Sequence, residues 1–176
     1  MMFNRSPERK RNRLPHFDYS QPGFYFITIC THQFIPYFGS NKNGEMQLNQ
    51  FGEIAKSCWE IIPNHFDHIA LDEFIIMPNH VHGIIEIESS IVGNADRCSL
   101  QKKNRQNMLI PKIIGAYKSS VSRKIKNRFT QSNFNWQKSY YDHVIRHERG
   151  LEQIRYYIKS NPDNWKTDKN NPVNFS

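Results

Sequence analysis

Two histidines separated by a single residue are the part of this sequence best suited to chemistry. His80 and His82 lie in a run of β-branched and apolar residues typical of a β-strand, whose successive side chains point to opposite faces. One face therefore carries both imidazoles together with Ile84, Glu86 and Glu88, and the other is an apolar core face of Val81, Ile85 and Ile87. Two neighbouring imidazoles on a rigid strand can hold one divalent metal ion.

A second group of candidates lies far along the chain from the histidines. Tyr157 and Asn161 are four residues apart in a segment with helical periodicity, so they share one helix face. Tyr156 points about 100° away and cannot present its hydroxyl at the same place. If one tyrosine reacts, Tyr157 is favoured, because a potential amide oxygen ligand lies one turn further on.

A phenol, two imidazoles and an amide oxygen suggest chemistry on a phosphodiester. A phenolate can attack the phosphorus and form a covalent phosphotyrosine. A metal ion would polarise the phosphate and stabilise charge on the leaving oxygen, and Mg²⁺ or Mn²⁺ suits such a site. The covalent intermediate keeps the bond energy, so this chemistry suits strand transfer better than hydrolysis.

The bulk properties fit a basic, folded domain. The chain has 176 residues, 38% of them hydrophobic, and a net charge of +8, which favours an acidic partner such as nucleic acid. Charge alone also fits a merely soluble basic protein. Three cysteines lie far apart, which argues against a zinc ribbon or a disulfide framework. With no signal peptide and no apolar run long enough for a membrane span, we expect a cytoplasmic protein.

Periodicity predicts the elements that must position these groups. We expect strands at 24–31, 68–77 and 80–88, and helices at 50–62, 108–129 (Ala116 among its inward residues) and 146–161. A hairpin should join 35–38 to 45–48 through Asn43-Gly44, and residues 140–145 should be extended. This order predicts an α+β fold, a ferredoxin-like or RRM-like antiparallel sheet with helices packed on one face.

The chain divides into three expected parts. Residues 1–16 form a basic N-terminal arm, residues 17–165 form one catalytic domain, and residues 166–176 form a polar C-terminal tail. Within the domain, residues 89–107 are rich in Ser, Gly, Asn and Gln and are predicted to be a loop.

Five blocks in this order resemble the REP-associated tyrosine transposases of bacteria, within the single-tyrosine HUH transposase superfamily. They are Gly23-Phe24-Tyr25-Phe26-Ile27-Thr28-Ile29-Cys30-Thr31, Met77-Pro78-Asn79-His80-Val81-His82-Gly83-Ile84, Ile114-Gly115-Ala116-Tyr117-Lys118-Ser119, Trp136-Gln137-Lys138-Ser139-Tyr140-Tyr141-Asp142-His143-Val144-Ile145-Arg146, and Ile154-Arg155-Tyr156-Tyr157-Ile158-Lys159-Ser160-Asn161-Pro162. The resemblance covers about residues 12 to 165, nearly the whole chain. A lone His-x-His pair would be a weak signal, whereas five blocks in order are a strong one.

The resemblance implies a set of roles. His80 and His82 are the histidine metal ligands, Tyr157 is the nucleophile, and Asn161 is the third ligand to Mg²⁺ or Mn²⁺. The implied substrate is single-stranded DNA beside a hairpin, cleaved to a 5′-phosphotyrosine and a free 3′-OH. A bacterial cytoplasmic enzyme that associates with the nucleoid when bound to DNA is the implied setting. Monomer and homodimer both stay open.

Basic side chains are the candidates for gripping DNA. We expect them to be Arg11, Arg13, Lys112, Lys118, Arg123, Lys124, Arg146 and Arg155. The plain alternative is a solvated basic face, and for Arg146 and Arg155 an ion pair with Glu148 or Glu152.

Structural interpretations compete with each assignment. The histidine pair could be structural, Tyr157 could be a core aromatic, and Tyr140 and Tyr141 are rival tyrosines. His143 and His147 could be offered as further ligands. Three other functions also compete: a non-catalytic module that binds single-stranded nucleic acid, a replication-initiation or plasmid-relaxing nuclease, and a zinc-bound structural protein. Adjacent tyrosines argue against a two-nucleophile nuclease, and four convincing zinc ligands are lacking.

Overall fold

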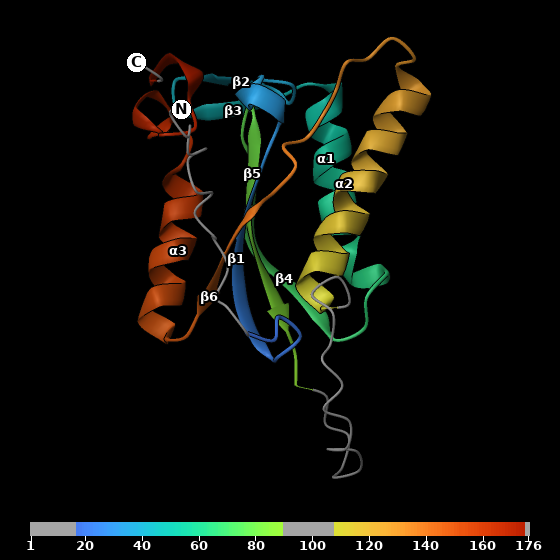
Figure 1. The fold of residues 1–176 in the computed structure, drawn as a ribbon. Helices are drawn as coiled ribbons and strands as arrows, with labels where there is room; N and C mark the ends of the chain where they lie inside the picture. The colour runs from blue at the N-terminus through green and yellow to red at the C-terminus, as the bar shows by residue number, and fades with distance from the viewer. Residues whose placement is uncertain (1–16, 90–107, 175–176) are drawn as a thin grey trace, which may run out of the picture.

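A computed structural model describes residues 17–89 and 108–174 (Figure 1). Its strands are β1 (Gly23–Cys30), β2 (Gly39–Lys42), β3 (Glu45–Leu48), β4 (Ile69–Ile76), β5 (His80–Ile87) and β6 (Tyr141–Ile145). Its α-helices are α1 (Gln50–Glu60), α2 (Leu109–Arg128) and α3 (Glu148–Ser160). Short 3₁₀ turns cover His32–Phe34, Ile62–Asn64, Trp165–Thr167 and Pro172–Asn174. Within the described residues, no helix is both long and apolar enough to span a membrane.

Four strands form the main sheet in the order β4-β5-β1-β6, and every neighbouring pair is antiparallel. Helix α1 connects β1 to β4, and α2 precedes β6, which gives the split βαβ pattern of ferredoxin-like folds. The predicted α+β class is confirmed. The central position of β1 places its residues beside both β5 and β6.

Helices α1 and α2 cover one face of this sheet. Alternation sends Tyr25, Ile27 and Ile29 of β1 and Val81 and Ile85 of β5 to that face, where they are buried. The fully buried indole of Trp59 on α1 packs into the same core. The predicted core face of β5 is therefore correct.

Helix α3 lies on the opposite face, which differs from the prediction that helices pack on one face (Figure 1). Its Leu151 and Ile158 are buried against Phe26, Ile84 and Ile145 of the sheet. The reason is that the histidine face of the sheet is apolar over part of its length. Only the remainder of that face, around His80 and His82, is left for a site.

Two local predictions also need correction. The hairpin turn is at Asn43-Gly44, as predicted, with φ of 52° and 83°, but its first strand covers 39–42 and not 35–38. Two such left-handed residues suit a tight two-residue hairpin turn, so strand β2 must directly precede Asn43. On α2, Ala116 is exposed, and the neighbouring Tyr117 takes the inward position and donates its hydroxyl to the carbonyl oxygen of Ala55.

Candidate functional site

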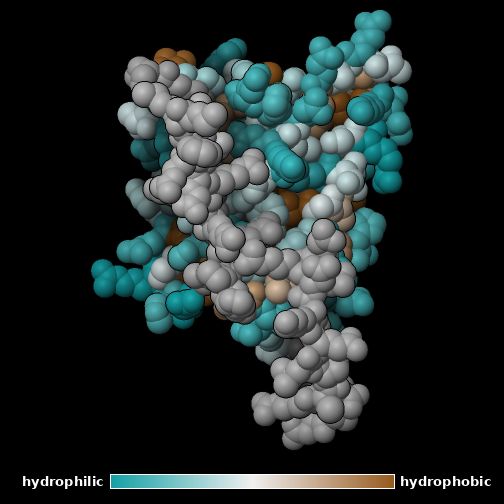
Figure 2. All heavy atoms as spheres, in the orientation of Figure 1, coloured by the Kyte–Doolittle hydropathy of each residue, from teal (hydrophilic) through white to brown (hydrophobic). Residues whose placement is uncertain are grey.

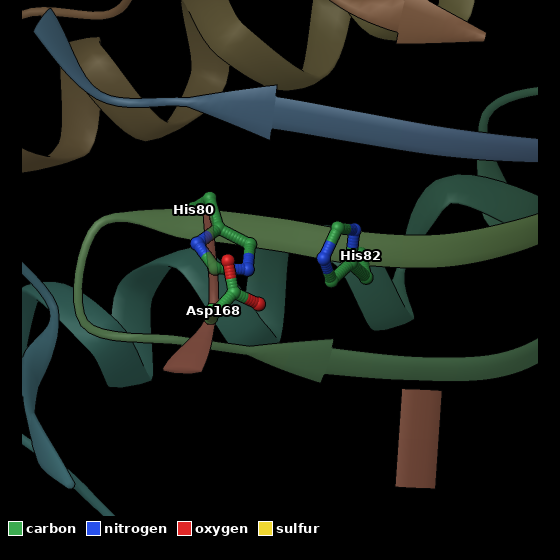
Figure 3. Close-up of side chains that lie close together, drawn as sticks. All are labelled: His80, His82 and Asp168. Carbon is green, nitrogen blue, oxygen red and sulfur yellow. The ribbon is translucent and has the colours of Figure 1, made fainter. Parts of the chain in front are cut away.

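Strand β5 presents both imidazoles on the face opposite the main core (Figure 3). His80 and His82 are fully buried, and their ring centroids are 4.4 Å apart. Across the ladder, His82 pairs with Thr28 of β1. The pleat of the strand thus produces the side-by-side pair that the His-x-His spacing predicts.

Hydrogen bonds to the Nδ1 atoms orient both rings. His80 Nδ1 lies 2.8 Å from Asn79 Oδ1, and His82 Nδ1 lies 2.8 Å from Thr28 Oγ1. An amide oxygen only accepts, so His80 carries its proton on Nδ1 and keeps a lone pair on Nε2. That Nε2 is buried and has no hydrogen-bond partner among the described residues.

Burial keeps both imidazoles neutral. Desolvation lowers the pKa of His80 to about 4, although the charge of Asp168 acts in the opposite direction. Desolvation, followed by the proximity of His80, lowers the pKa of His82 well below its usual value. Neutral imidazole is the form that binds metal, so neither ring has to lose a proton at neutral pH.

A carboxylate that the sequence analysis did not identify completes this group. Asp168 is buried beside the histidines, and ligand atoms of His80, His82 and Asp168 all lie within 4.8 Å of one another. Its Oδ1 accepts a hydrogen bond from the backbone N–H of Asn170. The predicted tail at 166–176 instead contributes buried residues up to Asn171 and folds against the site.

Asn161 caps the C-terminal end of α3 and is buried next to this cluster. Its Nδ2 donates to Asp168 Oδ2 at 3.2 Å, which orients the amide. The Oδ1 atom is buried without a hydrogen-bond partner in the described part of the chain. The amide is close enough to act on the pKa of both His80 and Tyr157.

These atoms fit a divalent cation. The His80 nitrogen and the Asn161 oxygen are buried lone pairs without partners among the described residues, which is a costly arrangement unless something binds them. With the second imidazole and the Asp168 carboxylate they form a mixed nitrogen and oxygen donor set. The set includes the three predicted ligand residues and adds one.

The structure brings Tyr157 to the histidines and leaves Tyr156 outside. Tyr157 Oη lies 3.3 Å from His82 Nε2, and its ring packs edge-on against Phe26. Tyr156 is 74% exposed, compared with 37% for Tyr157. Burial, together with the nearby charge of Asp168, raises the pKa of the Tyr157 phenol.

A cavity of about 600 Å³ opens in front of Tyr157 and His82. Strand β1, the segment 137–141 and the C-terminal segment 164–170 form its walls. Tyr140 and Tyr141, the rival tyrosines, line the same cavity. His143 and His147 are exposed and do not join the cluster of His80, His82 and Asp168.

The predicted DNA-binding residues are scattered in the structure. Lys112, Arg123 and Lys124 are exposed on α2, which packs on the sheet face opposite the histidines (Figure 1). Lys118 is half-buried and donates to the carbonyl oxygen of Gln137 at the cavity wall. Arg146 is exposed where β6 meets α3. Arg11 and Arg13 lie outside the described residues.

Arg155 has a structural partner instead of a free charge. Its guanidinium hydrogen-bonds both carboxylate oxygens of Asp72 on β4 and also contacts Glu152. These bonds lower the pKa of Asp72. Its donors are occupied in this clamp between α3 and β4, which gives Arg155 a structural role, and its contact with DNA stays a prediction.

Comparisons with known proteins support the fold. No protein-family profile matches the chain. A protein of Haemophilus influenzae, described only as uncharacterized, is 41% identical over 168 residues, which cover 92% of each chain. The solved structure of a REP-associated tyrosine transposase bound to a REP hairpin has the same fold, with a TM-score of 0.57 and 14% identity over 89% of this chain and 77% of that one.

Proposed function

We propose that this chain, which belongs to the same protein family as the Haemophilus influenzae protein, is a transposase of the REP-associated, single-tyrosine HUH class. It would cleave and rejoin single-stranded DNA beside a hairpin. The observation that carries the proposal is the approach of Tyr157 Oη to a buried pair of imidazoles with a free Nε2 lone pair beside them. This arrangement places the Tyr157 hydroxyl beside metal-binding nitrogens and at an open cavity, as a nucleophile at a metal site requires.

The proposed ligands are His80, His82, Asn161 and Asp168, with Mg²⁺ or Mn²⁺ as the ion. A cation held there would polarise the scissile phosphate and offset the charge on the departing oxygen. The Asn79 amide oxygen fixes the tautomer of His80 that leaves a lone pair on Nε2, and the Thr28 hydroxyl orients the ring of His82. His82 Nε2 can accept a hydrogen bond from Tyr157 or bind an ion, so an ion bound by His82 would free the phenol from this hydrogen bond.

The covalent step is a transesterification. A bond forms between Tyr157 Oη and the scissile phosphorus, and the bond from phosphorus to the 3′ oxygen of the preceding nucleotide breaks. The phenol proton leaves to water through the open cavity, and the departing oxygen takes a proton from water to become a 3′-OH. Attack by a 3′-OH on the phosphotyrosine reverses these events and joins the strands.

The decisive experiment is a covalent-adduct assay. The protein is incubated with Mn²⁺ and single-stranded hairpin DNA from the flanks of its own gene, and the products are separated on a denaturing gel. Tyr157→Phe should abolish the adduct and His80→Ala should nearly abolish it, while Tyr156→Phe, the adjacent matched control, should leave it intact.

Two outcomes would contradict the proposal. If Tyr141→Phe removes the adduct and Tyr157→Phe does not, the nucleophile is misassigned. If the protein binds the DNA tightly and forms no adduct with any metal, it is a non-catalytic module for single-stranded nucleic acid.

A further inference from the structure

Three strands carry a row of side chains that crosses the histidine face of the sheet. Thr28 of β1 pairs with His82 of β5 on one side and with Tyr141 of β6 on the other. Directly paired residues of neighbouring strands point to the same face. Tyr141 therefore lies two strands from His82, at about 10 Å, on the same surface.

The ring of Tyr141 is open to the cavity. Its side chain is 43% exposed and lines the cavity together with Thr28 and His82 of the same row. Phe26 contacts it edge-on, with 6.4 Å between ring centroids, and is itself buried. An aromatic ring that is supported from below and open above is the kind of surface on which unpaired bases stack.

An unpartnered donor lies in the wall of the same cavity. Asn170 is 7% exposed, and its Nδ2 has no hydrogen-bond partner in the described part of the chain. Its backbone is held on both sides, since its N–H donates to Asp168 and its carbonyl oxygen accepts from Asn79. A rigid, buried amide group with free donor capacity suits the acceptor atoms on the edge of a base.

We propose that Tyr141 and Asn170 form a subsite for the unpaired base of a nucleotide next to the scissile phosphate. The base stacks on the Tyr141 ring, and the Asn170 amide donates to its edge. This proposal rests on the proposed function, because the phosphate of the same strand then lies between Tyr157 and the imidazoles. A base beside its own phosphate spans the distance from His82 to Tyr141.

Binding measurements on protein that cannot cleave test the subsite. All variants carry Tyr157→Phe, and affinity is measured by fluorescence anisotropy with a labelled hairpin oligonucleotide that has unpaired flanks. Tyr141→Ala should weaken binding about 5- to 100-fold, the usual effect of removing one base–aromatic stack. Tyr141→Phe keeps the ring and should stay within about twofold of the parent. Tyr156→Ala, an exposed tyrosine outside the cavity, should have no effect.

An abasic scan distinguishes stacking from a general loss of structure. Single abasic sites are placed at each unpaired position of the oligonucleotide. At one position, the abasic site should weaken binding to the parent protein by the same factor as the Tyr141→Ala substitution does. The same abasic site should not weaken binding to the Tyr141→Ala protein any further. Asn170→Ala should reduce the discrimination between bases at that position alone.

The outcomes separate this inference from the proposed function. The subsite is refuted if Tyr141→Ala binds as tightly as Tyr141→Phe. It is also refuted if every abasic site that weakens binding to the parent weakens binding to Tyr141→Ala as well. Both conclusions hold even when the protein with Tyr157 intact forms an adduct. If the adduct never forms but the Tyr141 variants change binding as expected, the subsite is supported and the proposed cleavage activity is refuted. If no variant binds the oligonucleotide, both are refuted.

Discussion

Asn79 illustrates how much one side chain determines at this site. Its Oδ1 accepts from His80 Nδ1, and its Nδ2 donates to the carbonyl oxygens of Phe34 and Asn170. The amide thereby fixes the tautomer of an imidazole and also holds the C-terminal segment that carries Asp168. Asn79 is fully buried, and its loss would affect both of these proposed ligands at once.

Asp168→Asn should weaken Mn²⁺ binding by at least about tenfold. The substitution keeps the shape of the side chain but removes the negative charge and one acceptor oxygen from the cluster with His80 and His82. Isothermal titration calorimetry of the full chain measures the affinity. Asp163→Asn, an exposed carboxylate near the same segment, is the matched control and should bind as the parent does. Equal affinities of the two variants would remove Asp168 from the ligand set.

The cleavage rate should rise with pH. Burial and the charge of Asp168 raise the pKa of the Tyr157 phenol, so the phenol is neutral at neutral pH and the reactive phenolate is a minor form. Each added pH unit below that pKa should increase the single-turnover rate about tenfold. The rate is measured from pH 6 to 9 at saturating Mg²⁺, a range that lies below the raised pKa, so the rate should rise throughout the series without a plateau. A flat profile over this range would mean that ionisation of the phenol does not limit cleavage.

Among the elements, β5 depends on a close approach to α1. Gly83 follows His82 and faces the main core, where a Cβ atom would overlap the ring of Trp59. The strand therefore needs glycine at this position in order to lie flat against the indole while it presents both imidazoles on its other face.

Gly83→Ala should destabilise the protein by about 1–3 kcal/mol, because the added methyl overpacks a rigid indole. Gly115→Ala on α2, where an added methyl would meet open space, is the control and should stabilise by about 0.5–1 kcal/mol. Urea unfolding measures both changes. Similar effects of the two substitutions would show that Trp59 yields easily.

Local patterns predicted the parts of the site that lie within single elements. The alternation around His80 and His82 and the four-residue spacing of Tyr157 and Asn161 are properties of one strand and one helix. Asp168 and Asn170 lie beyond Pro162, between two short 3₁₀ turns and in a segment with no apolar period, so their burial comes only from tertiary contacts such as that with Asn79. The placement of α3 was missed for a related reason, since the apolar half of its sheet face becomes visible only when Phe26, Ile84 and Ile145 lie together.

At the scale of the whole molecule, the layers separate the basic helix from the cavity. Helix α2 covers one face of the sheet (Figure 1). The cavity beside His82 opens on the other face. Hydrophilic side chains cover the outer side of α2 in the space-filling view (Figure 2). A short single strand bound in the cavity, as we propose, would therefore contact Lys169 and not the outer side of α2.

The salt dependence of binding should reflect these layers. With a short unpaired oligonucleotide, Lys169→Gln should reduce the slope of log K against log salt by about 0.7, the contribution of one phosphate contact on a single strand. The triple variant Lys112→Gln, Arg123→Gln, Lys124→Gln should keep the slope of the parent. Anisotropy titrations at several salt concentrations supply the data. A smaller slope of log K against log salt in the triple variant would show that α2 belongs to the DNA-binding surface.

The central position of β1 in the sheet has a consequence for how this protein folds. The contacts that assemble the site join residues 54 and 75 positions apart, from Thr28 to His82 and from His82 to Tyr157. Pairings of such long range form late, whereas helices can form from local contacts. A partly folded chain would therefore carry the positive charge that attracts nucleic acid before it has any ability to cut. On refolding, strand cleavage should return with the slowest phase, after the helical circular dichroism signal has recovered.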